Sequence, residues 1–172
     1  SRAPYVSDRD RVQLDAEGSI QYGMYYWDDN YPDSHVFAEG ECLRKTFDPD
    51  FMLYHTMAVD EWGHMKGADS AEYANAVAAV GHLIAARMPE WLEKGYQVVV
   101  TADHGMNNLG IHVGTEHAQR EVALYIFSDK VENGRFEENY ISQLNVAPLV
   151  CKLMGVPATE DMKQELEIVF SK

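Results

Sequence analysis

Two short clusters of acidic and imidazole side chains are the residues of this chain best suited to chemistry. Asp60 is followed four positions later by His64, and Asp103 is followed directly by His104. Carboxylate and imidazole groups are common ligands of zinc, and a reactive zinc site takes three of them and keeps one position open. Each cluster supplies two ligands, so the pattern predicts a metal site with further ligands from elsewhere. Ions held in this way support the hydrolysis of phosphate esters.

The missing ligand is expected from the loop that follows Gly105. This loop contains two histidines, His112 and His117, and the residue types alone do not choose between them. An isolated Asp-x-x-x-His pair is common, so the prediction depends on finding two clusters together with the loop histidines. His55 and His82 fall within a predicted strand and a predicted helix, and we treat both as structural.

Two apolar runs are expected to position the clusters. Residues 51–59 and 96–101 each have the pattern of a buried strand, and an acidic residue follows the first directly, at Asp60, and the second after Ala102, at Asp103. Adjacent residues at a strand end point in different directions, so Asp103 and His104 can serve neighbouring ions. In open sheets, groups that follow the carboxyl ends of strands form the site. We therefore expect both clusters to contribute to one site.

Helical patterns separate the strands. Residues 70–94 carry apolar side chains at helical spacing after a sequence that resembles a capping box, and Pro89 either bends this helix or splits off its last turn. The order of strands and helices predicts crossover connections. The expected fold is therefore α/β, with a mainly parallel sheet and helices on both faces. Further helices are predicted at residues 34–45 and 140–154, and a further strand at residues 122–127.

The 172 residues are expected to form a single partial domain with three segments. Residues 1–46 are irregular and read as a cap-like N-terminal segment. Residues 47–157 form the core that carries the metal site, and residues 158–172 form a C-terminal tail.

Composition limits the classes of partner. The net charge is −14, from 28 acidic and 14 basic residues, which disfavours nonspecific binding of nucleic acid. The same balance suits a protein that holds cations, although a solvated acidic surface would also produce it. No apolar run is long enough to cross a membrane. We therefore expect neither nucleic acid nor a membrane as a partner.

The segments around both clusters resemble a known family. Asp60-Glu-Trp-Gly-His64 and Asp103-His-Gly-Met106 are similar to motifs of the alkaline phosphatase superfamily, in its type I phosphodiesterase and nucleotide pyrophosphatase branch. The likeness covers residues 47–157 and corresponds to the C-terminal half of that domain. It includes the loop at residues 110–115, the strand at residues 120–126 and the closing helix at residues 144–157.

The resemblance implies an alkaline-phosphatase-like domain with two divalent metal ions. One ion would be held by Asp60, His64 and His112, and the other would involve Asp103 and His104. His112 is favoured because its spacing from Asp103 matches that branch. His117 is the alternate, because related mutases place a histidine just before their equivalent of residues 121–124. Zinc fits these mixed carboxylate and imidazole ligands, and manganese binds similar sets.

One part of the family pattern is missing. The family's nucleophile is a serine or threonine that follows another metal-binding aspartate, and no segment before Asp60 has this pattern. We therefore expect an incomplete domain that supplies the C-terminal ligands of a hydrolase acting on small phosphate esters or nucleotides. The alternative is a metal-binding or partner-binding subdomain without turnover. An incomplete domain also predicts either self-association or a missing N-terminal segment. A redox or nucleotide-binding module is disfavoured because no glycine-rich phosphate loop is present.

Overall fold

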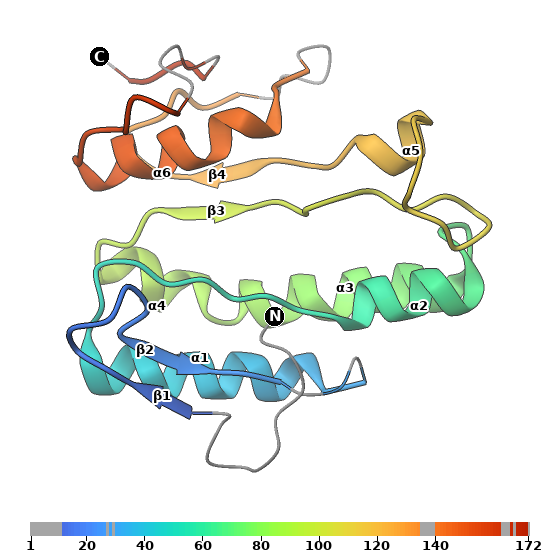
Figure 1. The fold of residues 1–172 in the computed structure, drawn as a ribbon, viewed down its shortest axis with the longest axis horizontal. Coiled ribbons are helices and arrows are strands. Elements are labelled where there is room, and N and C mark those ends of the chain that lie inside the picture. Colours follow the sequence, from blue (N-terminus) through green and yellow to red (C-terminus); the bar gives the residue numbers. More distant parts are fainter. Residues whose placement is uncertain are drawn as a thin grey trace. The chain divides into compact units, whose positions relative to one another are not determined.

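The computed structural model describes residues 12–26, 28, 30–134, 140–162, 166 and 168–171. It divides into two compact units, Ser1–Met88 with Asp103–Val122, and Pro89–Ala102 with Ala123–Lys172. Helices and strands occur in both units, so the mixed α/β class is confirmed (Figure 1). Residues 1–11 of the predicted cap-like segment, and several residues of the predicted tail, lie outside the described residues.

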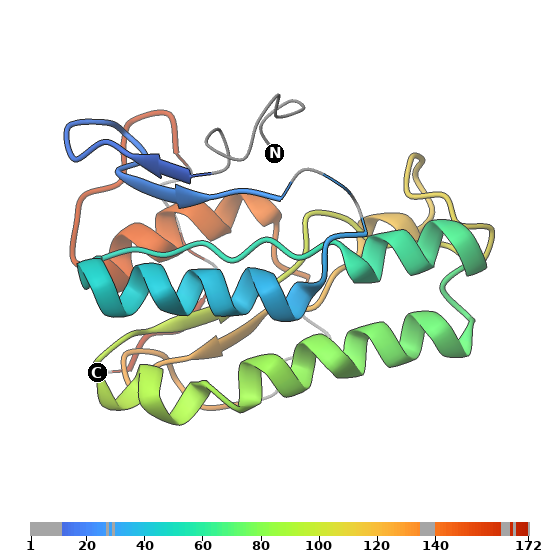
Figure 2. The ribbon, with the colours of Figure 1, turned by 90° about the horizontal axis from the view of Figure 1, so that it is seen from below.

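The first unit begins with a hairpin packed on a helix. Strands β1 (Val12–Leu14) and β2 (Tyr22–Met24) pair antiparallel, with Gln13 opposite Gly23. The hairpin lies beside α1 (Asp33–Phe47) in both views (Figures 1 and 2), and the Tyr22 ring stacks on the ring of Phe47 with centroids 3.8 Å apart. The helix predicted at residues 34–45 is therefore confirmed, slightly extended at each end.

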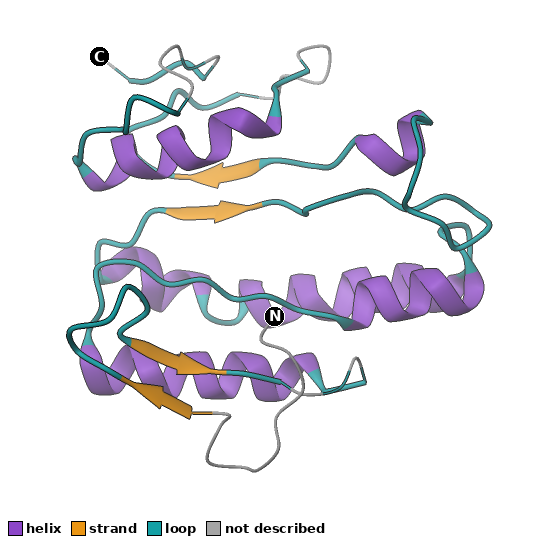
Figure 3. Ribbon diagram, viewed as in Figure 1, coloured by secondary structure: helices purple, strands orange, loops and turns teal. Residues whose placement is uncertain are grey.

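The segment that leads from α1 into the site is extended but unpaired. Residues 51–57 run as a loop in Figure 3, and no strand pairs with them among the described residues. Exposed and half-buried side chains alternate from residue 51 to residue 56, which is the period of a strand with one covered face. The predicted strand at residues 51–59 is therefore wrong as secondary structure, because a strand also requires a hydrogen-bonded neighbour. Tyr54 points into the unit, where its hydroxyl donates to Glu41 at 3.0 Å, and burial followed by the charge of Glu41 raises its pKa.

Three helices follow. Helix α2 (Ala58–Lys66) begins at residues predicted to end a strand, and α3 (Ala71–Ala85) is capped by Ser70, whose hydroxyl accepts the Tyr73 amide at 3.1 Å. The predicted helix at residues 70–94 is split, because a short second helix, α4 (Met88–Glu93), follows a break after α3. Pro89 lies in the first turn of α4, where its missing N–H is tolerated.

The second unit contains most of α4, a strand pair and a further helix. Strands β3 (Val98–Val100) and β4 (Tyr125–Phe127) are joined in antiparallel register, with Val99 opposite Ile126. The predicted helix at residues 140–154 is present as a short 3₁₀ turn, η2 (Gln143–Asn145), followed by α6 (Val146–Met154). Gly155 ends α6 at a φ of 74°, and the apolar face of α6 buries Leu149 and Leu153.

The predicted parallel sheet is not found in the described part of the chain, since both strand pairs are antiparallel. A parallel pair needs a crossover that carries the chain back along the sheet. Between β3 and β4 the chain instead follows a loop with one short helix, α5 (His117–Arg120), and returns in the opposite direction. Among the described residues, no helix is both long and apolar enough to span a bilayer.

Candidate metal centre

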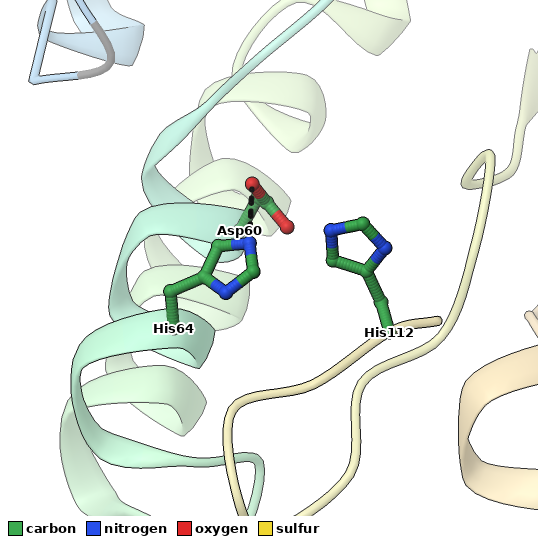
Figure 4. A group of neighbouring side chains, drawn as sticks. All are labelled: Asp60, His64 and His112. Carbon is green, nitrogen blue, oxygen red and sulfur yellow. Dashed lines mark ion pairs between the residues drawn. The ribbon is translucent and has the colours of Figure 1, made fainter. Parts of the chain in front are cut away.

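Helix α2 brings the first two candidate ligands together. Asp60 lies in its first turn and His64 one turn later, so both side chains project from the same face. The Asp60 Oδ2 atom is 3.5 Å from His64 Nε2 (Figure 4). Helix α2 therefore places the two side chains one turn apart, where both can reach one ion, as their four-residue spacing predicted.

His112 approaches the same place from a different part of the chain. Its ring faces the carboxylate of Asp60 from the loop after Gly110 (Figure 4). One ligand atom from each of Asp60, His64 and His112 lies within 4.8 Å of the other two. The centroids of the two imidazole rings are 4.9 Å apart, at an interplanar angle of 63°. These three side chains, called here the ligand triad, can therefore share one ion.

A backbone contact fixes the orientation of His64. Its Nδ1 lies 2.8 Å from the carbonyl oxygen of Gly110. Because a carbonyl only accepts, Nδ1 donates in this contact, and Nε2 is the ring nitrogen that faces Asp60. Gly110 itself has a φ of 73°, and a Cβ atom there would stand 2.6 Å from the His64 carbonyl oxygen. The close approach of these two backbones joins the His112 loop to α2.

The second predicted cluster lies beside the triad. His104 Nε2 is 3.8 Å from Asp60 Oδ1 and 3.7 Å from Asp103 Oδ2, and its Nδ1 lies 3.0 Å from the carbonyl of Gly105. The His104 ring also stacks on the ring of His112, with centroids 3.9 Å apart. The Asp103 side chain is 70% exposed, so it reaches open space beside the triad.

His117 is placed elsewhere. Its side chain is 89% exposed, and its Nδ1 contacts a carboxylate oxygen of Glu121 one turn along α5. The structure therefore brings His112, and not His117, to Asp60 and His64.

Comparison with known proteins identifies the family. Residues 9–164 match the family model described as type I phosphodiesterase / nucleotide pyrophosphatase. The chain belongs to this family. The phosphodiesterase family lies within the alkaline phosphatase superfamily of phosphoester-handling proteins, as the motifs around Asp60 and Asp103 predicted.

Relatives of this phosphodiesterase-family chain are much longer proteins. The mouse protein named GPI ethanolamine phosphate transferase 3, catalytic subunit, is 28% identical over 148 residues, which are 81% of this chain and 13% of that protein. The human protein of the same name is 29% identical over 63% of the chain and 10% of its own length. The 2,3-bisphosphoglycerate-independent phosphoglycerate mutase of Wolinella succinogenes is 31% identical over 68% of the chain and 23% of its own length. No solved structure matches the chain.

The burial and the donor atoms of the triad suit a divalent cation. Asp60 Oδ1 is buried and has no hydrogen-bond donor among the described residues. A buried carboxylate oxygen without a partner is unfavourable unless a cation compensates it. Burial and, to a smaller extent, the negative charge of Asp60 raise the pKa of the neighbouring Tyr73. One carboxylate and two imidazoles around one point are the donor set that zinc or manganese accepts.

Two buried amide side chains position the loop of this phosphodiesterase-family site, and neither was among the predicted site residues. Asn107 Oδ1 accepts the amides of Leu109 and Ile111 at 3.0 and 2.9 Å. Gln119 Nε2 donates to the carbonyl of Ile111 at 3.3 Å and to that of Val113 at 3.1 Å. These two residues lie on either side of His112. The adjacent asparagines at residues 107–108 are a turn signal. Gln119 has a local partner as well, because its Oε1 accepts the Glu116 amide at 3.2 Å in a capping box, but its bonds to the loop carbonyls have no local sequence signal.

Replacing Gln119 by alanine is expected to weaken zinc binding about 10-fold without removing a ligand, because residues that orient ligands typically contribute 10- to 100-fold. The amide of Gln119 holds the backbone on both sides of His112. Titration calorimetry with zinc chloride measures the change. Gln21→Ala is the matched control, since that amide bonds to the carbonyl of Ala16 within its own turn and should leave zinc affinity unchanged. An equal loss in both variants, or none in Gln119→Ala, would contradict this role.

Proposed function

We propose that this chain supplies metal ligands to a domain that cleaves phosphate esters with the help of divalent cations. In this proposal Asp60, His64 and His112 hold one ion, while Asp103 and His104 contribute to a second. The observation that carries the proposal is the convergence of the triad around a buried Asp60 oxygen that has no hydrogen-bond donor among the described residues. Membership of a phosphoester-handling superfamily supports it.

Each residue has a distinct task in the proposed site. When bound, divalent ions stabilise negative charge on phosphoryl oxygens and make water more acidic. Asp60 supplies the negative charge that attracts the cation. The Gly110 carbonyl binds Nδ1 of His64, which leaves Nε2 of that ring to bind the ion. His104 is likewise oriented by the Gly105 carbonyl, which directs its Nε2 toward Asp60 and Asp103. We favour zinc, and manganese suits the same ligands.

The reaction class depends on what attacks phosphorus. Attack by water is hydrolysis, and the expected substrates are small phosphodiesters, pyrophosphates or phosphomonoesters. Attack by an alcohol transfers the phosphoryl-containing group to that alcohol. The names of the mouse and human relatives favour transfer of ethanolamine phosphate as the second candidate function. Both reactions would use the same cation ligands, so the triad supports either.

For the complete domain we infer an alkaline-phosphatase-like sheet with helices on both faces. Membership of the phosphodiesterase family supports this inference. The division into a cap-like segment, a metal-site core and a tail stays a prediction.

Metal binding by the chain tests the proposal directly. We expect zinc chloride, titrated into the folded metal-free chain, to bind saturably at the triad, and manganese to compete for the same site. Nuclear magnetic resonance of the histidine rings should show His64 and His112 responding together, with exposed His82 on α3 as an internal reference. A folded chain that binds neither metal at these histidines would overturn the proposal.

Product analysis separates the two reaction classes. The complete protein, loaded with metal, is incubated with bis(p-nitrophenyl) phosphate in water, and with a phosphoethanolamine donor and an added alcohol. A free phosphate monoester as the product supports hydrolysis, whereas a new diester with the alcohol supports transfer. Metal binding without either product would favour the alternative of a non-catalytic metal-binding subdomain.

A further inference from the structure

A mainly apolar hollow with two carboxylates in its lining lies in the first unit, formed by the start of α1, the first turns of α2 and one face of α3. Its volume is about 510 Å³. The lining residues that matter chemically are Asp33, Trp62, Glu72 and Asn75, with Ala76 and Leu83 on the apolar side. The triad residues Asp60, His64 and His112 are not part of this lining.

Asp33 is the unusual residue in this hollow. It is only 7% exposed, and one carboxylate oxygen, Oδ1, accepts the amides of Met57 and Ala58 at 3.1 and 3.4 Å. The other oxygen, Oδ2, is buried and has no hydrogen-bond partner among the described residues. Buried carboxylates are normally paired with a cation or satisfied by donors. Half of the Asp33 carboxylate therefore lacks the partner that its burial requires.

The charges around the hollow favour a cationic occupant. Glu72 is the second carboxylate of the lining, and no lysine, arginine or histidine is among the lining residues described. The two acids belong to different helices, α1 and α3, so they face the hollow from separate elements. A positive group entering the hollow would meet uncompensated negative charge.

The remaining lining favours an organic cation over a metal ion. A metal ion needs several donor atoms at one point, and the only cluster of three such ligands in the described part of the chain is the triad. The hollow instead adds the indole of Trp62 and the aliphatic side chains of Ala76 and Leu83. Aromatic faces attract ammonium groups, and aliphatic surfaces accept the carbon chain attached to them.

We propose that this hollow binds the primary ammonium group of a small organic molecule. Asp33 Oδ2 accepts one of the three ammonium N–H groups, Glu72 adds a second negative charge, and Trp62 and Leu83 contact the alkyl chain. The proposal is independent of the metal centre, because no triad residue lines the hollow.

The probe for this site is n-butylammonium, with 1-butanol as its uncharged counterpart. Each is titrated into the chain while nuclear magnetic resonance follows the Trp62 indole and the backbone amides of Met57 and Ala58, which bond to Asp33. We expect saturable shifts with n-butylammonium at millimolar concentration and much weaker shifts with 1-butanol. Equal binding of both probes would overturn the proposal, since the hollow would then be merely apolar. Saturable binding of magnesium or zinc at these amides in place of n-butylammonium would also overturn it.

Variants sharpen the test. Asp33→Asn keeps an oxygen for the α2 amides but removes the charge, and it should weaken n-butylammonium binding about 10-fold, as expected for loss of a charge-assisted hydrogen bond. Glu72→Gln is on an exposed position of α3, so it should fold normally and reduce binding by a smaller factor. Asp69→Asn removes an exposed charge that does not line the hollow, and it should have no effect. Unchanged binding in Glu72→Gln, or equal losses in Glu72→Gln and Asp69→Asn, would contradict the site even if Asp33→Asn failed to fold.

Discussion

Replacing Asp60 by asparagine is expected to weaken zinc binding by at least about 100-fold, more than the loss typical of an orienting residue. Asparagine keeps the shape of the side chain but removes the charge that compensates the cation. The effect should be large because Asp60 lies between the imidazoles: His64 Nε2 is 3.5 Å from Oδ2, and His104 Nε2 is 3.8 Å from Oδ1. Competition with a zinc-binding dye measures the dissociation constant over this range.

The control for Asp60→Asn is Asp69→Asn, which removes an exposed carboxylate between α2 and α3. It changes the net charge equally but touches no candidate ligand, so zinc affinity should stay within about twofold, as for weak surface electrostatics. The metal-free Asp60→Asn chain should remain folded by circular dichroism, because Oδ1 has no donor to lose among the described residues. Zinc affinity equal to that of the unsubstituted chain would show that Asp60 is not a ligand.

Replacing Gly110 by alanine is expected to lower the free energy of unfolding by about 2–4 kcal/mol, from backbone strain together with overpacking. Gly110 has a φ of 73°, which side-chain-bearing residues rarely adopt. The new Cβ would also stand 2.6 Å from the His64 carbonyl oxygen and 2.9 Å from that of Gly63. Since neither backbone atom can move without displacing α2, the loop must shift. Urea denaturation measures the loss, and zinc affinity should fall with it because His112 follows two residues later.

Gly81→Ala is the matched control for this substitution. Gly81 lies inside α3, and a Cβ there meets no heavy atom within 4 Å outside its own helix. Alanine should raise the free energy of unfolding by about 0.5–1 kcal/mol, because it costs less conformational entropy in a helix than glycine. If Gly110→Ala were as well tolerated as Gly81→Ala, the close approach between the His112 loop and α2 would not exist in the folded chain.

Local patterns predicted the elements that depend on neighbouring residues. The capping serine at Ser70 begins α3, and Gly155 ends α6. The four-residue spacing of Asp60 and His64 predicted that both could reach one ion, and the structure places them one turn apart on α2 because one helical turn is a local repeat. The motifs around Asp60 and Asp103 also predicted the family, because a family motif is a property of consecutive residues.

The partners and directions of the strands could not be predicted from local sequence patterns. Residues 51–56 have the alternation of a strand, yet no neighbour pairs with them in the described structure. Strands β3 and β4 were predicted from their apolar runs, but their antiparallel direction depends on the path of the long connection between them. Hydrophobic periodicity reports which face of a segment is covered, and it does not report which segment covers it.

The amino-acid sequence by itself determined the residue types of the candidate metal centre, the helical spacing of Asp60 and His64, and the family. Only the tertiary structure decided that His112 rather than His117 reaches them, and that Gln119 and Gly110 hold the loop in place. It also decided that Asp33 is buried with one oxygen unpaired among the described residues. The physical reason is that loop paths and burial depend on contacts between residues far apart in the chain, whereas helix spacing and caps depend on near neighbours.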